Sequence, residues 1–140
     1  MKILHIEITD FHPMLVHFPI ALLCIGFLFD LIGYKYNIDS FKTSGWYCQI
    51  SGVISFIPTI ITGILDNKNN SAGFLEIQSN LKDFLLIHGT VELSVCLVFI
   101  VLLYYRYEKN RIVSISYFFV YFISLLGLLY GALLGGGYYH

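Results

Sequence analysis

Four long stretches of this 140-residue chain are almost free of Asp, Glu, Lys and Arg, and this pattern limits the possible folds more than any other feature. A helix of about 20 apolar residues crosses a hydrocarbon layer of ~30 Å. Inside lipid, a helix satisfies its backbone polar groups within its own segment. We therefore expect an all-α integral membrane protein, one four-helix bundle over residues 1–140. The predicted spans are residues 12–34, 43–65, 84–105 and 112–135.

The composition excludes several other classes of protein. With 57% hydrophobic and 12% charged residues, the chain has more apolar surface than a soluble core of this size can bury, so the lipid bilayer is an expected partner. A net charge of −1 without a basic run excludes nucleic-acid binding. Cys24, Cys48 and Cys96 lie inside spans without a CxxC pair, which indicates neither a disulfide framework nor a thiolate metal site.

Positively charged residues in the short loops predict the orientation, because Lys and Arg are retained on the cytoplasmic side during insertion. The loops after the first and third spans contain Lys35, Lys42, Arg106, Lys109 and Arg111. The amino terminus and the loop after the second span contain Lys2, Lys68 and Lys82. Five positive residues against three favour one orientation, and four crossings put both termini on one side. We expect both termini on the outer side.

All five histidines fall in the outer half of this predicted topology. They are His5, His12, His17, His88 and His140. Ionisable groups inside a membrane are costly and are candidates for function by default, so a cluster on one side is informative. The outer half is therefore the predicted location of a functional site.

Helix geometry separates the candidate ligands. Five residues at about 100° each put His12 and His17 about 140° apart around the helix axis, so they cannot easily share one metal. His17 lies about 7.5 Å deeper, and we expect it to be the better buried ligand, whereas His12 before Pro13 is also typical of a helix start. His88 and Glu92 are four residues apart and share one face of the third span.

A b-type haem fits this arrangement best, because two neutral imidazoles from different helices can clamp the iron. We expect His17 and His88 to form the ligand pair, and a second pair, His12 with His140, would hold a second haem. Two alternatives remain open, namely histidines without any metal, and zinc or copper bound by three histidines, although no HExxH helix is present.

Small residues recur at a spacing of four in the last span and form one stripe along the helix. They are Gly127, Gly131 and Gly135. Such a stripe allows a very close approach, either by another helix or by the face of a flat cofactor. Gly127 and Gly131 are therefore candidate cofactor-binding residues.

The segment HPMLVHFPIAL, from His12 to Leu22, resembles the signature of a bacterial family of small four-helix membrane proteins classed as a domain of unknown function. His88 matches a histidine that opens the third span in that family. The closing residues Gly135, Gly136, Tyr138, Tyr139 and His140 match its last element loosely, and the chain ends there. The resemblance covers nearly the whole chain. It implies a haem-binding module associated with respiratory proteins, in a bacterial inner membrane with periplasmic termini, but it supplies no established chemistry.

Two functions are therefore considered. The first is an electron-transfer subunit, rather than a stand-alone enzyme, in which haem b near the periplasmic face exchanges electrons with a cytochrome c or another subunit. Glu92 would accept a linked proton in such a protein, or would simply pair with a nearby histidine or hydroxyl. The alternative is a non-catalytic structural subunit of a larger respiratory complex, without a redox centre. A transporter is disfavoured, because Asp30 is the one ionisable group expected in the inner leaflet.

Overall fold

The computed structural model describes residues 11–69, 89–109 and 113–136, which form four α-helices and no β-strand. The helices are α1 (Phe11–Lys35), α2 (Asp39–Asn69), α4 (Thr90–Glu108) and α5 (Ile115–Gly136). Each contains an apolar stretch long enough to cross a membrane. The predicted all-α four-helix fold is confirmed.

Helix α4 contains a residue that the sequence places outside the membrane. The third span is predicted to end at Tyr105, with Arg106 in the following loop, and this prediction is wrong. The apolar span of α4 extends from Thr90 to Glu108, and Arg106 is 0% exposed. Arg106 stays in the bundle because its guanidinium has an ion-pair partner there, the carboxylate of Asp30.

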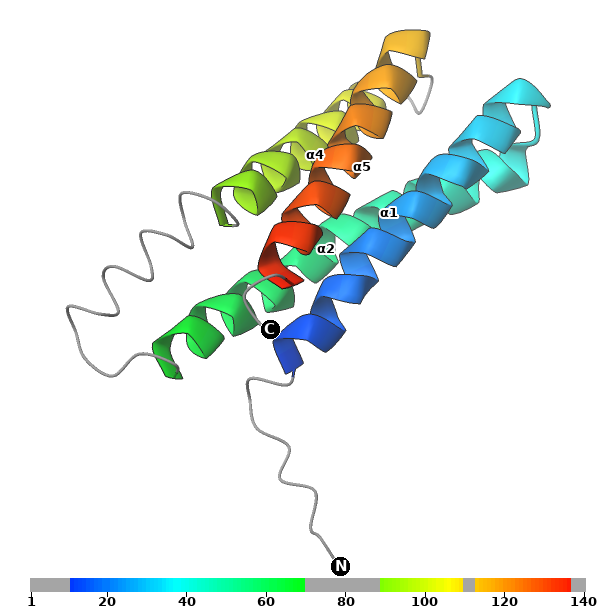
Figure 1. Ribbon diagram of the computed structural model, residues 1–140. Coiled ribbons are helices and arrows are strands. Elements are labelled where there is room, and N and C mark those ends of the chain that lie inside the picture. Colours follow the sequence, from blue (N-terminus) through cyan, green and yellow to red (C-terminus); the bar gives the residue numbers. More distant parts are fainter. Residues whose placement is uncertain (1–10, 70–88, 110–112, 137–140) are drawn as a thin grey trace, which may run out of the picture.

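The helices form two antiparallel hairpins, α1 with α2 and α4 with α5 (Figure 1). Further contacts join α1 to α5 and α2 to α4. Within the described residues, the diagonal pairs α1–α4 and α2–α5 have no Cα atoms within 8 Å of each other. We call the end with the α1–α2 turn, where α4 ends and α5 begins, the hairpin end (Figure 1). The opposite end, where α1 begins and α5 ends, is the terminal end.

A left-handed residue makes the sharp turn between α1 and α2. Asn37 has φ 54°, a conformation that Asn tolerates better than most residues. The amide of Ile38 then donates to the carbonyl of Gly33 at 2.9 Å, the bond that closes a Schellman motif. The turn therefore satisfies helix-end carbonyls at a point where the chain reverses.

Glycines allow α1 and α2 to pack with little space between their backbones. A Cβ on Gly26 would lie 3.1 Å from the Cβ of Cys48, and one on Gly52 would lie 2.7 Å from Cγ of Leu23. Side chains at either position would push the helices apart. Small residues at such positions are typical of helix pairs in membranes, where van der Waals packing stabilises association.

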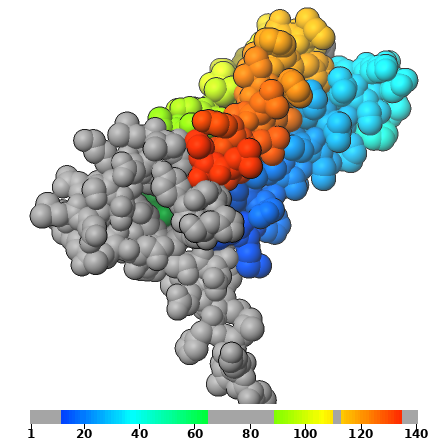
Figure 2. All heavy atoms as spheres, viewed as in Figure 1, coloured from blue at the N-terminus to red at the C-terminus, as the bar shows by residue number. Residues whose placement is uncertain are grey.

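The core is aromatic, and the outer surface is apolar. Leu23, Phe99 and Tyr121 are each 0% exposed. Around them, α5 lies along α1 on one outer face of the bundle (Figure 2), and many large apolar side chains point outward, such as Leu97 and Val101 at 63% and 64% exposed. Lipid is a good solvent for this surface, whereas in water it would drive association. The chain is therefore a multi-pass membrane protein.

Candidate functional site

His12 is the buried histidine of α1. Its side chain is 8% exposed, and Nδ1 lies 3.1 Å from the carbonyl of Thr59 and 3.3 Å from Oγ1 of Thr62. A ring nitrogen close to a carbonyl oxygen must donate, so Nδ1 carries a hydrogen. The ring also packs on Gly63, where a Cβ would lie 2.9 Å from Cε1.

His17 lies on the outside of the bundle, and the prediction that it is the better buried histidine is wrong. Its ring is exposed, and Nδ1 donates to the carbonyl of Pro13 at 2.6 Å, within the same helix. The separation of about 140° around the axis holds, but packing on α2 turns His12 inward and His17 outward. The greater depth of His17 along the helix axis therefore did not make it the more buried of the two histidines.

The remaining predicted ligands cannot be placed. His5, His88 and His140 lie outside the described residues, so the pairs His17–His88 and His12–His140 stay predictions. Within residues 11–69, 89–109 and 113–136, no group of three or more His, Cys, Asp and Glu side chains is arranged to hold a metal ion.

The glycine stripe of α5 packs against α4. A Cβ on Gly127 would lie 3.0 Å from Cγ2 of Val95, and one on Gly131 would overlap the carboxylate of Glu92. These two glycines therefore accommodate the side chains of a neighbouring helix, the first of the two alternatives considered for the stripe. The surroundings of Gly135 are not among those that the structure describes.

A small cavity lies at the terminal end between all four helices. Its volume is about 70 Å³, and its lining is almost entirely apolar, although His12 of α1, Thr59 of α2 and Glu92 of α4 border it. Leu128 contributes the wall from α5. Sites for ligands of drug or cofactor size usually measure about 300–1,000 Å³. A porphyrin does not fit this cavity.

The described residues therefore do not fit a haem inside one bundle. His17 is outside, Gly127 and Gly131 contact α4, and the cavity beside His12 is too small. Any haem that His17 ligates would have to lie on the outer surface of α1.

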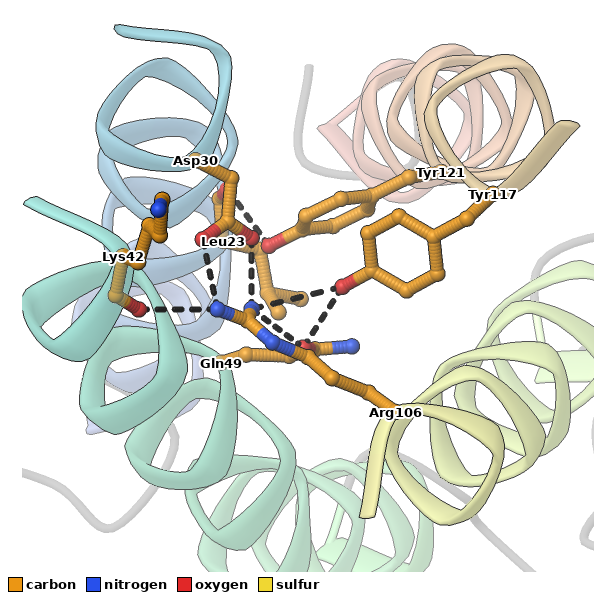
Figure 3. A network of polar contacts seen from close by, with 7 residues as sticks. All are labelled: Leu23, Asp30, Lys42, Gln49, Arg106, Tyr117 and Tyr121. Atoms are coloured by element: carbon orange, nitrogen blue, oxygen red, sulfur yellow. Dashed lines mark hydrogen bonds and ion pairs between the residues drawn. The ribbon is translucent and has the colours of Figure 1, made fainter. Parts of the chain in front are cut away.

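A second polar cluster crosses the bundle towards the hairpin end, and it was not predicted from the sequence (Figure 3). The guanidinium of Arg106 makes a two-pronged ion pair with Asp30, at 2.5 Å from Nη1 to Oδ2 and 2.7 Å from Nη2 to Oδ1. Both side chains are 0% exposed. Planar bidentate pairing is the strongest arrangement available to these two groups.

Three further groups surround the guanidinium of Arg106. Nη1 donates to Oε1 of Gln49 at 3.2 Å, and Nη2 donates to the carbonyl of Lys42 at 2.8 Å. The ring of Trp46 lies 5.4 Å from the guanidinium carbon, within the range of a cation–π contact. These contacts compensate the two Nη groups of the buried guanidinium, whereas its Nε–H has no hydrogen-bond partner among the described residues.

Two tyrosines of α5 complete this cluster (Figure 3). The hydroxyl of Tyr117 donates to Oε1 of Gln49 at 2.8 Å, and that of Tyr121 donates to the carbonyl of Leu23 at 3.0 Å. Asp30–Arg106 joins α1 to α4, and Gln49–Tyr117 joins α2 to α5. The two pairs of helices that do not touch through their backbones are thus connected by side chains.

The signal for this cluster was present in the sequence. Asp30 and Arg106 carry opposite charges near the carboxyl ends of two spans that run in the same direction, and an intramembrane charge usually has a partner. Counting Arg106 as a loop residue hid the pair, and the inference that Asp30 is alone in that half of the bundle is corrected.

The apolar outer surface, the four long helices and the buried polar clusters define a small multi-pass membrane protein built as a single bundle. The chain belongs to the family of predicted membrane proteins designated DUF2231, whose family model matches residues 9–138. The family membership predicted from the sequence is confirmed. No curated protein and no solved structure matches the chain significantly.

Proposed function

We propose that the chain is a non-catalytic subunit of a larger membrane complex, and that it docks through the outer face of α1 near the terminal end. The observation that carries this proposal is the exposure of His17. His17 lies five residues inside the apolar span that begins at His12, or about 7.5 Å along the axis. Hydrocarbon offers no hydrogen bond to an imidazole, so an outward histidine at this depth favours a protein neighbour.

The residues around His17 provide a suitable contact surface. Met14 is 64% exposed and Phe18 is 58% exposed, and Ala21 is also exposed one turn further along. Large flexible and aromatic groups beside a small residue allow a partner helix to pack closely. The partner expected from this chemistry is a transmembrane helix with a hydrogen-bond donor opposite Nε2 of His17.

A photo-crosslinking amino acid at Phe18 tests the proposal in native membranes. Ile54 of α2 is equally exposed, at 58%, and is the matched control. We expect a crosslinked protein product from position 18, lost in His17→Leu, and none from position 54. Equal crosslinking at both positions, or at neither, contradicts docking through α1.

Haem-dependent electron transfer is the second candidate, and one observation favours it. His17 already donates Nδ1–H to a backbone carbonyl, the arrangement in which Nε2 is the ligating nitrogen. A haem would then lie between this surface and a partner subunit, where it supplies one-electron chemistry to a periplasmic cytochrome c or another subunit. The role of this chain would be to orient the imidazole and shield it from water.

The absorption spectrum separates the two candidates. A Soret band in the purified complex, shifted on reduction with dithionite and lost in His17→Ala but kept in His12→Ala, supports the haem. A colourless complex that still crosslinks at position 18 supports the structural subunit.

A further inference from the structure

The cavity at the terminal end has an apolar lining because the polar groups beside it are directed at helix backbones. The hydroxyl of Thr59 donates to the carbonyl of Ser55 at 2.9 Å, and Nδ1 of His12 lies 3.1 Å from the carbonyl of Thr59. The carboxylate of Glu92 lies against Gly131 of α5, a residue that does not line the cavity. The surface left to the cavity is therefore almost entirely carbon.

The lining and the size of the cavity limit what can bind there. A buried water needs two to four polar partners, and apolar cavities in proteins stay dry. The volume of about 70 Å³ is also smaller than the ~150 Å³ that holds a benzene ring. A suitable occupant is therefore apolar and narrow.

The cavity reaches the outer surface of the bundle between α2 and α4. Ile64 of α2 and Leu93 of α4 both line it, and they are 41% and 40% exposed. Ile64 is the last residue of the apolar span of α2, and Leu93 is the fourth residue of the span of α4, which begins at Thr90. The opening thus lies just inside the hydrocarbon layer, where the surrounding medium consists of acyl chains.

We propose that the cavity and its opening bind one acyl chain of a phospholipid from the leaflet at the terminal end. Acyl chains are as apolar as the lining, so the hydrophobic effect does not drive entry. The favourable contribution is van der Waals contact with lining atoms that would otherwise face a void. Because all four helices contribute to the lining, the chain connects the two hairpins at the end opposite the Asp30–Arg106 pair.

A phospholipid with a photoreactive diazirine in the half of one acyl chain nearer the glycerol tests this proposal on the full chain in membranes. Ile61 and Leu133 are controls near the same end, because they are 52% and 76% exposed and do not line the cavity. Bulk lipid labels side chains in the order of their exposure. We expect the reverse order, with labelling severalfold higher at Leu93 and Ile64 by peptide mass spectrometry. Labelling that follows exposure, highest at Leu133, overturns the proposal.

A variant that fills the cavity shows whether the chain lies inside it. Val16 of α1 lines the cavity, and Val16→Phe adds a ring to this space. The excess labelling at Leu93 and Ile64 should fall to the level of Ile61, whose own labelling should not change. An excess that persists in folded Val16→Phe places the chain outside the cavity and overturns the proposal. If the variant does not fold, the comparison of the four positions in the wild-type protein still decides.

A second variant separates an acyl chain from a ligand recognised by a polar group. Because the carboxylate of Glu92 is directed at Gly131, Glu92→Gln should leave the labelling of Leu93 unchanged. A severalfold loss in the folded variant would mean that the carboxylate recognises the ligand, and would overturn the proposal. The opening between α2 and α4 is separate from the docking surface proposed on α1, so crosslinking from position 18 can fail without affecting this result.

Discussion

The guanidinium of Arg106 in α4 and the carboxylate of Asp30 in α1 form a bidentate ion pair across the diagonal of the bundle, with both side chains fully buried. These two helices have no backbone contact within the described residues. The pair is the ion pair between the two hairpins in the described residues, and hydrogen bonds from Arg106, Tyr117 and Tyr121 add to it. Because both side chains are fully buried, loss of the pair should be measurable.

Removing one member of the Asp30–Arg106 pair should strongly destabilise the bundle. Asp30→Ala or Arg106→Ala leaves an uncompensated buried charge, and we expect the free energy of unfolding to fall by about 3–5 kcal/mol in each case. The double variant should lose less than the sum of the two. Titration with SDS in mixed micelles measures these values, and a loss below about 1 kcal/mol in both single variants would mean that the pair is solvated.

The hydroxyl of Tyr117 should contribute more than that of Tyr121. Tyr117→Phe removes the bond to Gln49 beside a buried charge, and we expect a loss of about 1.5 kcal/mol in the free energy of unfolding. Tyr121→Phe removes a bond to the carbonyl of Leu23, which lies inside helix α1, so about 0.5 kcal/mol is expected. The same SDS titration compares them, and a larger effect at Tyr121 would contradict this ranking.

Alanine at two glycines should have very different effects. A Cβ on Gly45 would overlap the carboxylate of Asp30, which cannot move without breaking its ion pair, so Gly45→Ala should cost about 1–3 kcal/mol or more. A Cβ on Gly127 would lie 3.0 Å from a methyl group of Val95. There the strain is offset by a gain of about 1 kcal/mol in helix propensity, so Gly127→Ala should be close to neutral. Similar losses in both variants would be inconsistent with the packing at Gly45.

The orientation in the membrane remains a prediction that a reporter can test. With Arg106 neutralised inside the bundle, the positive residues at the hairpin end fall from five to four, against three at the terminal end. The bias still favours a cytoplasmic hairpin end. Alkaline phosphatase fused after His140 should be active, and fused at the α1–α2 turn it should be inactive. The opposite pattern would put both termini in the cytoplasm.

The burial of His12 rather than His17 could not be predicted from the geometry of α1 alone. The angle between them follows from helical geometry, but the side that faces inward depends on where α2 packs, through Gly52 and Gly63. Depth favoured His17, whereas tertiary contact buried His12 against Thr59. Which face of a helix is buried depends on the positions of the helices that pack against it.

The sequence by itself determined the fold class and the family, because long uncharged stretches have one stable form in lipid and because hydropathy is a local property of the chain. It also predicted that Glu92 shares one face of the third span with His88, which lies outside the described residues. Only the tertiary structure decided that Arg106 belongs to the bundle and pairs with Asp30, 76 residues away in the sequence. The physical reason is that the cost of burying a charge depends on what lies within a few ångströms of it, and that is fixed by the packing of all four helices.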